Sequence, residues 1–339
     1  ALDFDPAVSQ SSPGAPPSAQ SQQKTLQAAA LKAIYKPADP SLAPEMVTLS
    51  ALDDRVVEKL ATRAIRLVRA VWLGQQPDDY RIQCRQDLEA LERAGASPSP
   101  LRSPAEAVAL VRRCARAVGT LTYGWLSPGQ PDPAGARIRV VRAALEANGW
   151  IEALFWDFPS LYQQPRTPEQ DAQFKQGLSM MADLYASAVG TTVLQLKEIP
   201  PRPKEFDGAL ALFSLADGVD EAKIRAAFSR FGVVESVEIK DSHAPPPPAV
   251  VRLASHNDAL AALKAGAHDG ICDGVDTLYN ERSYDGREGE EGRDDDTGRG
   301  WCQLEGSVSG EAVLRLQDYP KMEAELSKLP HKVLALSSD

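Results

Sequence analysis

The chain has 339 residues, of which 43% are hydrophobic, and its 37 Lys and Arg against 47 Asp and Glu give a formal net charge of −10. This length and apolar content predict one large or two smaller domains with a sizeable core. The acidic balance argues against binding to duplex DNA or to an anionic membrane surface, since either needs a basic face. No apolar run approaches the roughly 20 residues of a membrane span.

The four cysteines are far apart, and neither a C-x-x-C motif nor a His/Cys cluster is present. We therefore expect no metal site. Scattered cysteines in a long chain are typical of reduced thiols, which favours an intracellular, cytoplasmic or organellar protein over a secreted one. The chain begins at Ala1 rather than Met, which is compatible with a removed targeting peptide.

The first part of the chain divides into an arm and a helical region. Residues 1–49 are rich in Ser, Pro, Gln and Ala, which predicts an extended or disordered arm. Residues 50–117 predict a helical extension. Its first helix opens at Ser50 and carries apolar residues at helical spacing as far as Val71, and a second spans about 78–94. A third begins at Ser103, with a proline and a glutamate in its first turn.

From Val118 onward, strands and helices alternate, which predicts an α/β domain over 118–204 and 276–339. Alternation of this kind implies parallel strands joined by crossover helices. We expect the Gly- and Asp-rich stretch 285–300 to be a mobile loop. The predicted strands are 118–123, 153–158, 191–196 and 333–336, and the predicted helices are 134–148, 168–188 and 301–316.

Residues 205–275 interrupt this domain with elements in the order β-α-β-β-α, which predicts an inserted ferredoxin-like module that resembles an RNA-recognition motif. Such motifs bind RNA by stacking bases on aromatic side chains of the strands. Here Ala211 stands where the leading aromatic residue is expected, and the strand 249–253 has no aromatic residue. The module therefore favours a protein contact or a purely structural role over RNA binding.

Two acidic residues are candidates for chemistry. Asp157 follows the apolar run at the expected carboxyl end of the second parallel strand, where open sheets bind their ligands. Its carboxylate can bind a ribose hydroxyl, orient a base or cap the next loop. Glu305 lies in the first turn of the predicted helix 301–316, where the helix dipole alone favours an acid. If the two meet across a cleft, they form a pair suited to acid–base work.

Four motifs occur in the order found in heterokaryon-incompatibility (HET) domains. Residues 122–125, Thr-Tyr-Gly-Trp, resemble that family's S-Y-x-W, and 155–163 resemble W-I-D-A-L-C-I-N-Q with the Asp and final Gln retained. Residues 181–188 resemble M-x-x-I-Y-x-x-A, and 299–305 resemble R-x-W-x-x-Q-E. The resemblance covers 118–200 and 299–336.

The HET family is considered related to the Toll/interleukin-receptor (TIR) fold, a flavodoxin-like parallel sheet. TIR-like domains assemble with one another in signalling, and some cleave NAD with a catalytic Glu. The resemblance thus implies Glu305 and Asp157 as the acidic positions. Ser160 replaces the family's Cys, and Tyr162 its Asn. The residues that the resemblance places around an NAD cofactor are Tyr123, Trp125, Ser160, Gln163 and Trp301.

Three functions are compatible with these observations. The first is a TIR-like module for association with protein partners or with itself, non-catalytic, acting as an accessory or scaffold subunit of a larger assembly. The second is an NAD-cleaving hydrolase that uses Glu305 together with Asp157. The third, which the missing aromatic residues disfavour, is RNA binding through the insertion.

Overall fold

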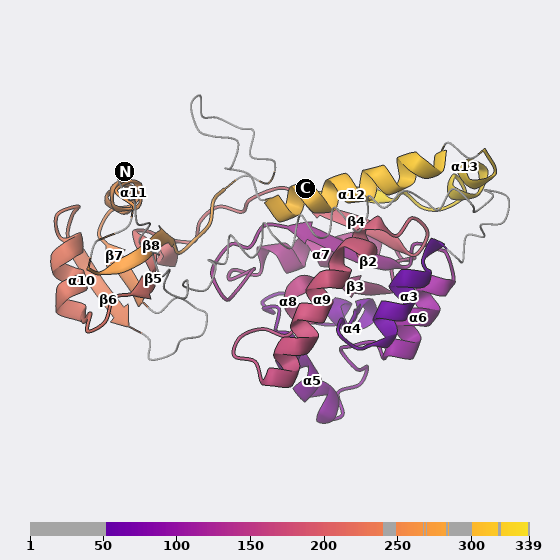
Figure 1. Cartoon of the computed structure of the whole chain (residues 1–339), viewed down its shortest axis with the longest axis horizontal. Coiled ribbons are helices and arrows are strands. Elements are labelled where there is room, and N and C mark those ends of the chain that lie inside the picture. The colour runs from indigo at the N-terminus through magenta and orange to yellow at the C-terminus, as the bar shows by residue number, and fades with distance from the viewer. Residues whose placement is uncertain are drawn as a thin grey trace, which may run out of the picture.

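The structure is a computed structural model that describes residues 52–239, 249–266, 268, 270–282, 284, 300–317 and 320–337. The predicted arm, 1–49, and residues 285–299 of the predicted loop lie outside the described residues. The chain forms a larger α/β unit and a smaller unit with its own sheet, joined by two connecting segments (Figure 1).

The larger unit is built on a five-stranded sheet in the order β1-β3-β2-β4-β9. Strands β2, β3, β4 and β9 are parallel to one another, as predicted. Strand β1 pairs with β3 in the antiparallel sense at one edge of the sheet. The strands are β1 (Val68–Arg69), β2 (Val118–Tyr123), β3 (Ala153–Phe155), β4 (Thr191–Leu196) and β9 (Val333–Leu336).

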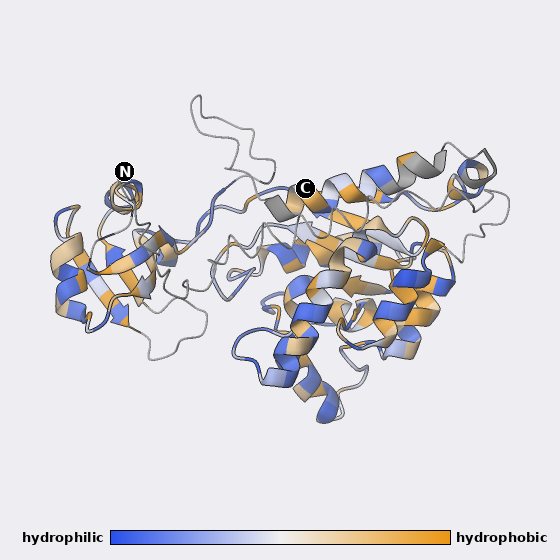
Figure 2. Ribbon diagram, viewed as in Figure 1, coloured by the Kyte–Doolittle hydropathy of each residue, from blue (hydrophilic) through white to orange (hydrophobic). Residues whose placement is uncertain are grey.

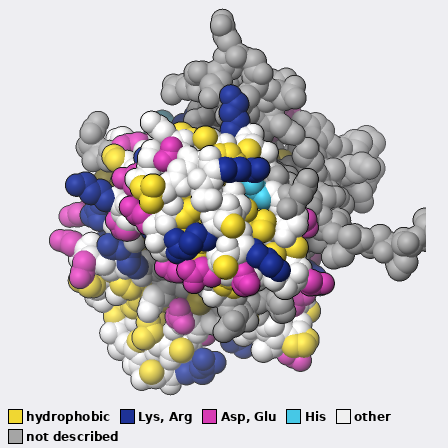
Figure 3. Space-filling view, turned by 90° about the vertical axis from the view of Figure 1, so that its left-hand side faces the viewer, with side chains coloured by type: hydrophobic (Ala, Val, Ile, Leu, Met, Phe, Trp, Pro, Cys, Tyr) yellow, Lys and Arg dark blue, Asp and Glu magenta, His cyan; other side chains and the backbone are white. Residues whose placement is uncertain are grey.

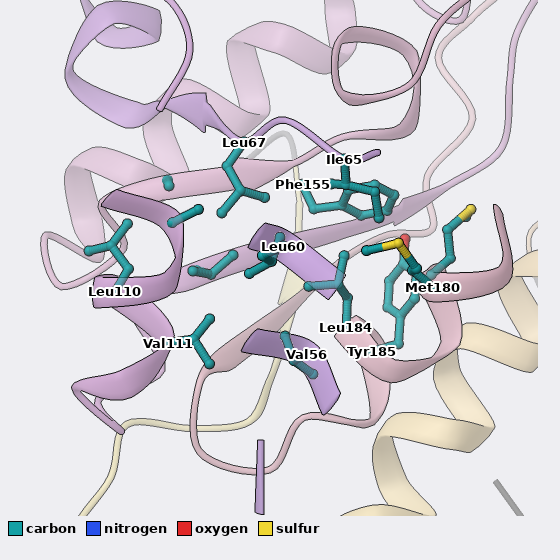
Figure 4. Packing of buried hydrophobic residues seen from close by; sticks show 14 of the residues in the cluster. Val56, Leu60, Ile65, Leu67, Leu110, Val111, Phe155, Met180, Leu184 and Tyr185 are labelled. Atoms are coloured by element: carbon teal, nitrogen blue, oxygen red, sulfur yellow. The ribbon is translucent and has the colours of Figure 1, made fainter. Parts of the chain in front are cut away.

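Helices cover both faces of this sheet, and the apolar residues lie between the layers (Figure 2). One face packs against α3 (Asp54–Ala61), α6 (Pro104–Arg112), α9 (Pro168–Ala186) and α12 (Gly300–Gln317). The other packs against α4 (Ala70–Gly74) and α7 (Ala136–Ala147). Figure 4 shows the first core, in which Leu60, Phe155 and Leu184 from a helix, a strand and another helix meet.

Capping boxes close the starts of α6 and α9, and the start at Ser103 is as predicted. The side chains of Ser103 and Thr167 each accept a hydrogen bond from the backbone N–H three residues later, and the side-chain oxygens of Glu106 and Gln170 accept one from the N–H of the cap residue. Each cap satisfies two of the backbone donors that a helix start leaves open. Losing such a cap costs about 1 kcal/mol.

The long helix predicted from Ser50 to Val71 is wrong. The helix α3 ends at Ala61, Arg63 takes a left-handed φ of 67°, and the chain then enters strand β1. The buried guanidinium of Arg85 captures the carbonyls of Arg63 and Ala64 at 2.9 and 2.8 Å, so these groups are no longer free for helical bonding. Tertiary contacts therefore outweigh the helical spacing of the apolar residues.

Two further element bounds differ from expectation. The helix predicted to start near residue 78 is α5 (Arg85–Arg93), which begins later. The strand predicted over 153–158 ends at Phe155, and Asp157 instead opens a one-turn helix, α8 (Asp157–Ser160). The carboxylate of Asp157 thus sits just past the carboxyl end of β3, close to its predicted place.

The smaller unit is an antiparallel sheet in the order β6-β7-β5-β8 with two helices packed on it. Its first five elements match the prediction. Strand β8 was not predicted, because its sequence, CDGVDT, carries two Asp and a Gly and lacks a strand-like apolar pattern. The elements are β5 (Ala209–Leu215), α10 (Glu221–Phe228), β6 (Val234–Ile239), β7 (Ala249–Leu253), α11 (His256–Lys264) and β8 (Cys272–Thr277). The 3₁₀ turn η2 (Lys204–Phe206) precedes this unit, and α13 (Pro320–Leu326), also not predicted, follows α12.

An ion cluster ties together the two segments that connect the units. Arg202, before the smaller unit, bonds Asp207 at 2.7 Å and also pairs with Glu281, which follows β8. The hydroxyl of Tyr279 donates to the carbonyl of Pro200 at 2.9 Å, again between the incoming and outgoing segments. These contacts hold the entry and the exit of the smaller unit side by side.

We predict that Gly208→Ala selectively destabilises the smaller sheet. Gly208 has φ +67°, and a Cβ there would lie 1.9 Å from the carbonyl oxygen of Leu253. Left-handed strain and this clash should together cost about 2 kcal/mol or more. The matched control is Gly218→Ala, with φ +70° and open space, which should cost only about 1 kcal/mol. Hydrogen exchange of the β5 and β7 amides measures the effect, and equal losses in the two variants would contradict this account.

Candidate functional site

The candidate site lies at the carboxyl ends of the parallel strands. The first of these in the chain, β2, pairs with β3 on one side and β4 on the other, so the chain changes direction across the sheet at β2. Ligands of open α/β sheets bind in the crevice at such a switch point. Here the strands end at Tyr123, Phe155 and Leu196, and the crevice would lie beyond them.

The carboxylate of Asp157 is fully engaged by donors from this edge. Tyr123 donates its hydroxyl to Oδ1 at 2.7 Å, and Trp125 donates its indole N–H to Oδ2 at 2.7 Å. The backbone N–H of Phe158 donates to Oδ1 at 2.7 Å. Burial raises the pKa of Asp157, while these three bonds act to lower it. The side chain therefore fixes the strand ends to the loop rather than presenting a free carboxylate.

Ser160 and Gln163 form hydrogen bonds with the backbone of the same loop. The hydroxyl of Ser160, fully buried, accepts the backbone N–H of Trp156 at 3.1 Å and so closes the turn of α8. The amide of Gln163 donates to the carbonyl of Leu161 at 3.0 Å and to that of Phe158 at 3.2 Å. Both side chains are thus used to shape the backbone around Asp157.

The crevice itself is occupied by Arg137, which is fully buried in the first turn of α7. Its guanidinium donates to the carbonyl of Gly124 at 3.2 Å, after β2, and to that of Glu198 at 2.6 Å, after β4. The cation also faces the ring of Tyr123, 5.8 Å from its centroid. Burial lowers the pKa of Arg137, although nearby Tyr123 and Asp132 oppose the effect. An arginine thus bridges β2 and β4 where a ligand would bind.

Glu305 lies beneath the sheet, where α12 packs against β2 and α9. The side chain is 7% exposed, and it is hydrogen-bonded with Thr122 of β2 and Tyr185 of α9. Burial, followed by the nearby Asp157 charge, raises its pKa to about 8 against the bonds from Thr122 and Tyr185. The Tyr185 hydroxyl donates to the carbonyl of Leu121 at 2.7 Å, which joins α9 to β2 beside Glu305.

The structure thus brings Asp157 and Glu305 within electrostatic range of each other, but the described residues leave little space beside Glu305. The cavity beside Glu305 and Tyr185 has a volume of about 10 Å³. This is space for a single water molecule at most. A nicotinamide ring cannot reach the carboxyl group of Glu305 in this conformation.

Of the residues predicted to surround a cofactor, Tyr123, Trp125, Ser160 and Gln163 do converge on the Asp157 loop. Tyr123 and Trp125 donate to the Asp157 carboxylate, whereas Ser160 and Gln163 bond to the backbone of the loop. Trp301 lies in the first turn of α12, and its side chain is outside the described part of the structure.

Sequence reasoning missed Arg137, Thr122 and Tyr185. A signal for Arg137 was present, because a cation in the first turn of a helix opposes the helix dipole and so calls for another partner. Thr122 and Tyr185 stood inside the HET-like motifs, but nothing in their spacing shows that they face Glu305. Only the packing of α12 on β2 and α9 brings Thr122, Tyr185 and Glu305 together.

No protein-family model matches the chain, and no curated protein matches it. Among the described residues, no group of three or more His, Cys, Asp and Glu side chains is placed to hold a metal ion. Within the same part of the chain, every helix is too short or too polar to cross a membrane.

We predict that the native protein becomes less stable as the pH rises and that Glu305→Gln abolishes this pH dependence. Because the folded-state pKa is raised from 4.5 to about 8, the folded protein holds a proton that the unfolded chain has released between these values. Stability of the native protein therefore falls by up to about 1.4 kcal/mol per pH unit across that window. The free energy of unfolding of Glu305→Gln lacks this pH dependence. The stability of the variant relative to the native protein therefore increases up to about pH 8.

Urea unfolding at several pH values measures the difference between the two proteins. Lys332, with a pKa lowered by burial to about 7, contributes a slope of the opposite sign at higher pH, but equally in both. Glu58→Gln, at an exposed carboxylate of α3, is the control and should leave the slope unchanged. Parallel pH profiles for the native protein and Glu305→Gln would show that Glu305 titrates normally.

Proposed function

We propose that the chain is a TIR/HET-like module for protein association, non-catalytic, that serves as an accessory or scaffold subunit. The observation that carries this proposal is the closed carboxyl edge, where Arg137 spans the carbonyls of Gly124 and Glu198. A ligand would have to displace a buried guanidinium and leave these carbonyls without partners, which costs about 1–3 kcal/mol for each group.

The fold supports the family part of this proposal. The parallel strands are ordered β3-β2-β4-β9, which is the second, first, third and fourth along the chain. This is the flavodoxin-like order that TIR domains share. The smaller sheet, β6-β7-β5-β8, has the strand order of a ferredoxin-like module. None of the four cysteines, all among the described residues, forms a disulfide, which supports an intracellular location.

RNA binding through the smaller unit has little support. Ala211, at the expected stacking position, is fully buried, and its cross-strand partners are Val250 and the acidic Asp276. Figure 3 shows Lys and Arg side chains interspersed with Asp and Glu on the face of this unit that turns to the viewer. RNA-binding surfaces need aromatic platforms and a continuous basic surface.

The strand β9 offers a surface for association. It pairs with β4 on one side, and no strand among the described residues pairs with its other side. Val333 is 36% exposed, and Ala335 is exposed as well. The opposite edge differs, because the segment around Leu101 bridges to Val68 and covers β1. Open edge strands readily pair with another chain, so we propose that association is homotypic through β9.

We predict that the protein releases no nicotinamide from NAD above the buffer rate, even at high protein concentration. The cavity of about 10 Å³ beside Glu305 excludes the ring. Chromatography of the reaction mixture measures the product, with Glu305→Gln as the matched control that should behave identically. Release that the native protein shows and Glu305→Gln lacks would favour the hydrolase.

We predict that the full chain self-associates and that Ala335→Lys weakens this association about tenfold, because a lysine on an edge strand opposes strand pairing. Sedimentation velocity over a range of concentrations measures the effect. Ser337→Lys adds the same charge at an exposed position just beyond β9 and should change little. A native protein that stays monomeric at every concentration, or equal effects of the two lysines, would overturn the role of β9.

A further inference from the structure

A second set of buried charges lies at the opposite, amino end of the main sheet. Arg116 precedes β2, Thr191 begins β4, and Lys332 precedes β9. Because these strands are parallel, their amino ends share one edge. A hollow of about 360 Å³ opens there. Its lining residues are Arg116, Glu323, Leu326, Ser327, Leu329, Pro330, His331 and Lys332.

The two cations in this hollow are buried yet keep unused donors. Arg116 is 4% exposed; its Nε donates to the carbonyl of Ala188 at 2.9 Å and its Nη1 to that of Pro330. The Nη2 of Arg116 forms no hydrogen bond with any described residue. Lys332 is 6% exposed, and its Nζ donates to the carbonyl and hydroxyl of Thr191 at 3.1 and 2.7 Å. An ammonium has three N–H groups, so one remains.

The charges of Arg116 and Lys332 are only partly balanced by neighbouring carboxylates. None of the ion pairs between described residues includes Arg116 or Lys332. Burial and the Arg116 charge lower the pKa of Lys332 to about 7, and Asp53 only partly opposes them. Asp53 is itself buried, which raises its pKa, and it accepts the Ser187 hydroxyl at 2.6 Å. Glu323 is the acid among the lining residues, and its side chain is exposed.

The backbone beside the hollow is also strained. Cys114 and Arg116 adopt left-handed φ values of 49° and 53°. Such a conformation costs a non-glycine residue about 1–2 kcal/mol. Arg116 has this strained backbone and also donates hydrogen bonds from its guanidinium to the carbonyls of Ala188 and Pro330. Backbone strain of this kind concentrates at ligand-binding positions.

We propose that this hollow binds a small dianion of the phosphate-monoester class. A guanidinium and an ammonium together are the side chains best suited to a phosphate group, one through its planar fork and the other as a point charge. The hollow is larger than a phosphate group alone and falls within the range of about 300–1,000 Å³ of small-molecule pockets. Leu326, Leu329 and Pro330 provide apolar contacts for the organic part of the ester.

The ligand neutralises the repulsion between Arg116 and Lys332, so bound anion and protonated Lys332 stabilise each other. Leu52, the first described residue, packs in one apolar cluster with Leu326 and Leu329.

The first experiment measures thermal unfolding of the full chain in sodium sulfate and in sodium chloride at equal ionic strength. We expect a saturable rise of Tm in sulfate alone. Lys332→Met, which keeps the volume of the buried side chain, should weaken sulfate binding at least tenfold. Lys328→Met, at an exposed lysine paired with Glu325, is the matched control and should bind as the native protein does.

The second experiment uses pH, because sulfate keeps both charges from about pH 6 to about pH 9 and its own titration does not interfere. Binding requires protonated Lys332, so affinity should fall by up to about tenfold per pH unit above pH 7. The other charged groups near Lys332 are Asp53, Arg116, Glu323 and His331. His331→Gln should retain this pH dependence.

Phenyl phosphate distinguishes a monoester site from a bare anion site, and it should bind more tightly than sulfate because the ring contacts the apolar lining. Equal effects of sulfate and chloride would overturn the proposal, as would unchanged binding in Lys332→Met. An affinity for sulfate that does not vary with pH would also overturn it. Weaker binding of phenyl phosphate than of sulfate would exclude the monoester class.

Discussion

The covered carboxyl end of the main sheet imposes the constraint on which the rest of the structure depends. Polar groups enclosed there lose their contact with water and must find partners within the protein. Asp157 obtains three donors, and Arg137 obtains the carbonyls beyond β2 and β4. The same bonds also link the end of β2 and the segments that follow β2 and β4 with the helices α7 and α8. Stability and loss of ligand access therefore have one physical origin.

The two ends of the sheet consequently differ in character. At the carboxyl end, an acid and a cation are each matched by neutral donors or acceptors, and little space remains. At the amino end, Arg116 and Lys332 face a hollow of about 360 Å³ with their charges only partly balanced. If the chain binds a small molecule, its electrostatics favour the amino end, which is opposite to the usual place in parallel sheets.

Much of the fold could be predicted because local pattern and tertiary environment agree. The strands β2, β4 and β9 have the predicted bounds, since each is an apolar run that is enclosed by helices or paired at its edge. Sequence and structure disagree where the same apolar pattern is compatible with both a helix and a strand. The apolar residues from Ala64 to Val68 fit a helix face, but they are buried on every side and continue into a strand. Strand β8 lacks the pattern and forms because β5 offers it a free edge.

The amino-acid sequence by itself determined the alternation of strands and helices, the cap at Ser103, the place of Asp157 after the second parallel strand, and the place of Glu305 near the start of a later helix. Only the tertiary structure decided that these acids are enclosed. The reason is that hydrogen-bond partners come from distant segments: Tyr123 is 34 residues from Asp157, and Pro330 is 214 residues from Arg116. A sequence specifies which groups must be satisfied, whereas the packing of distant elements decides what satisfies them.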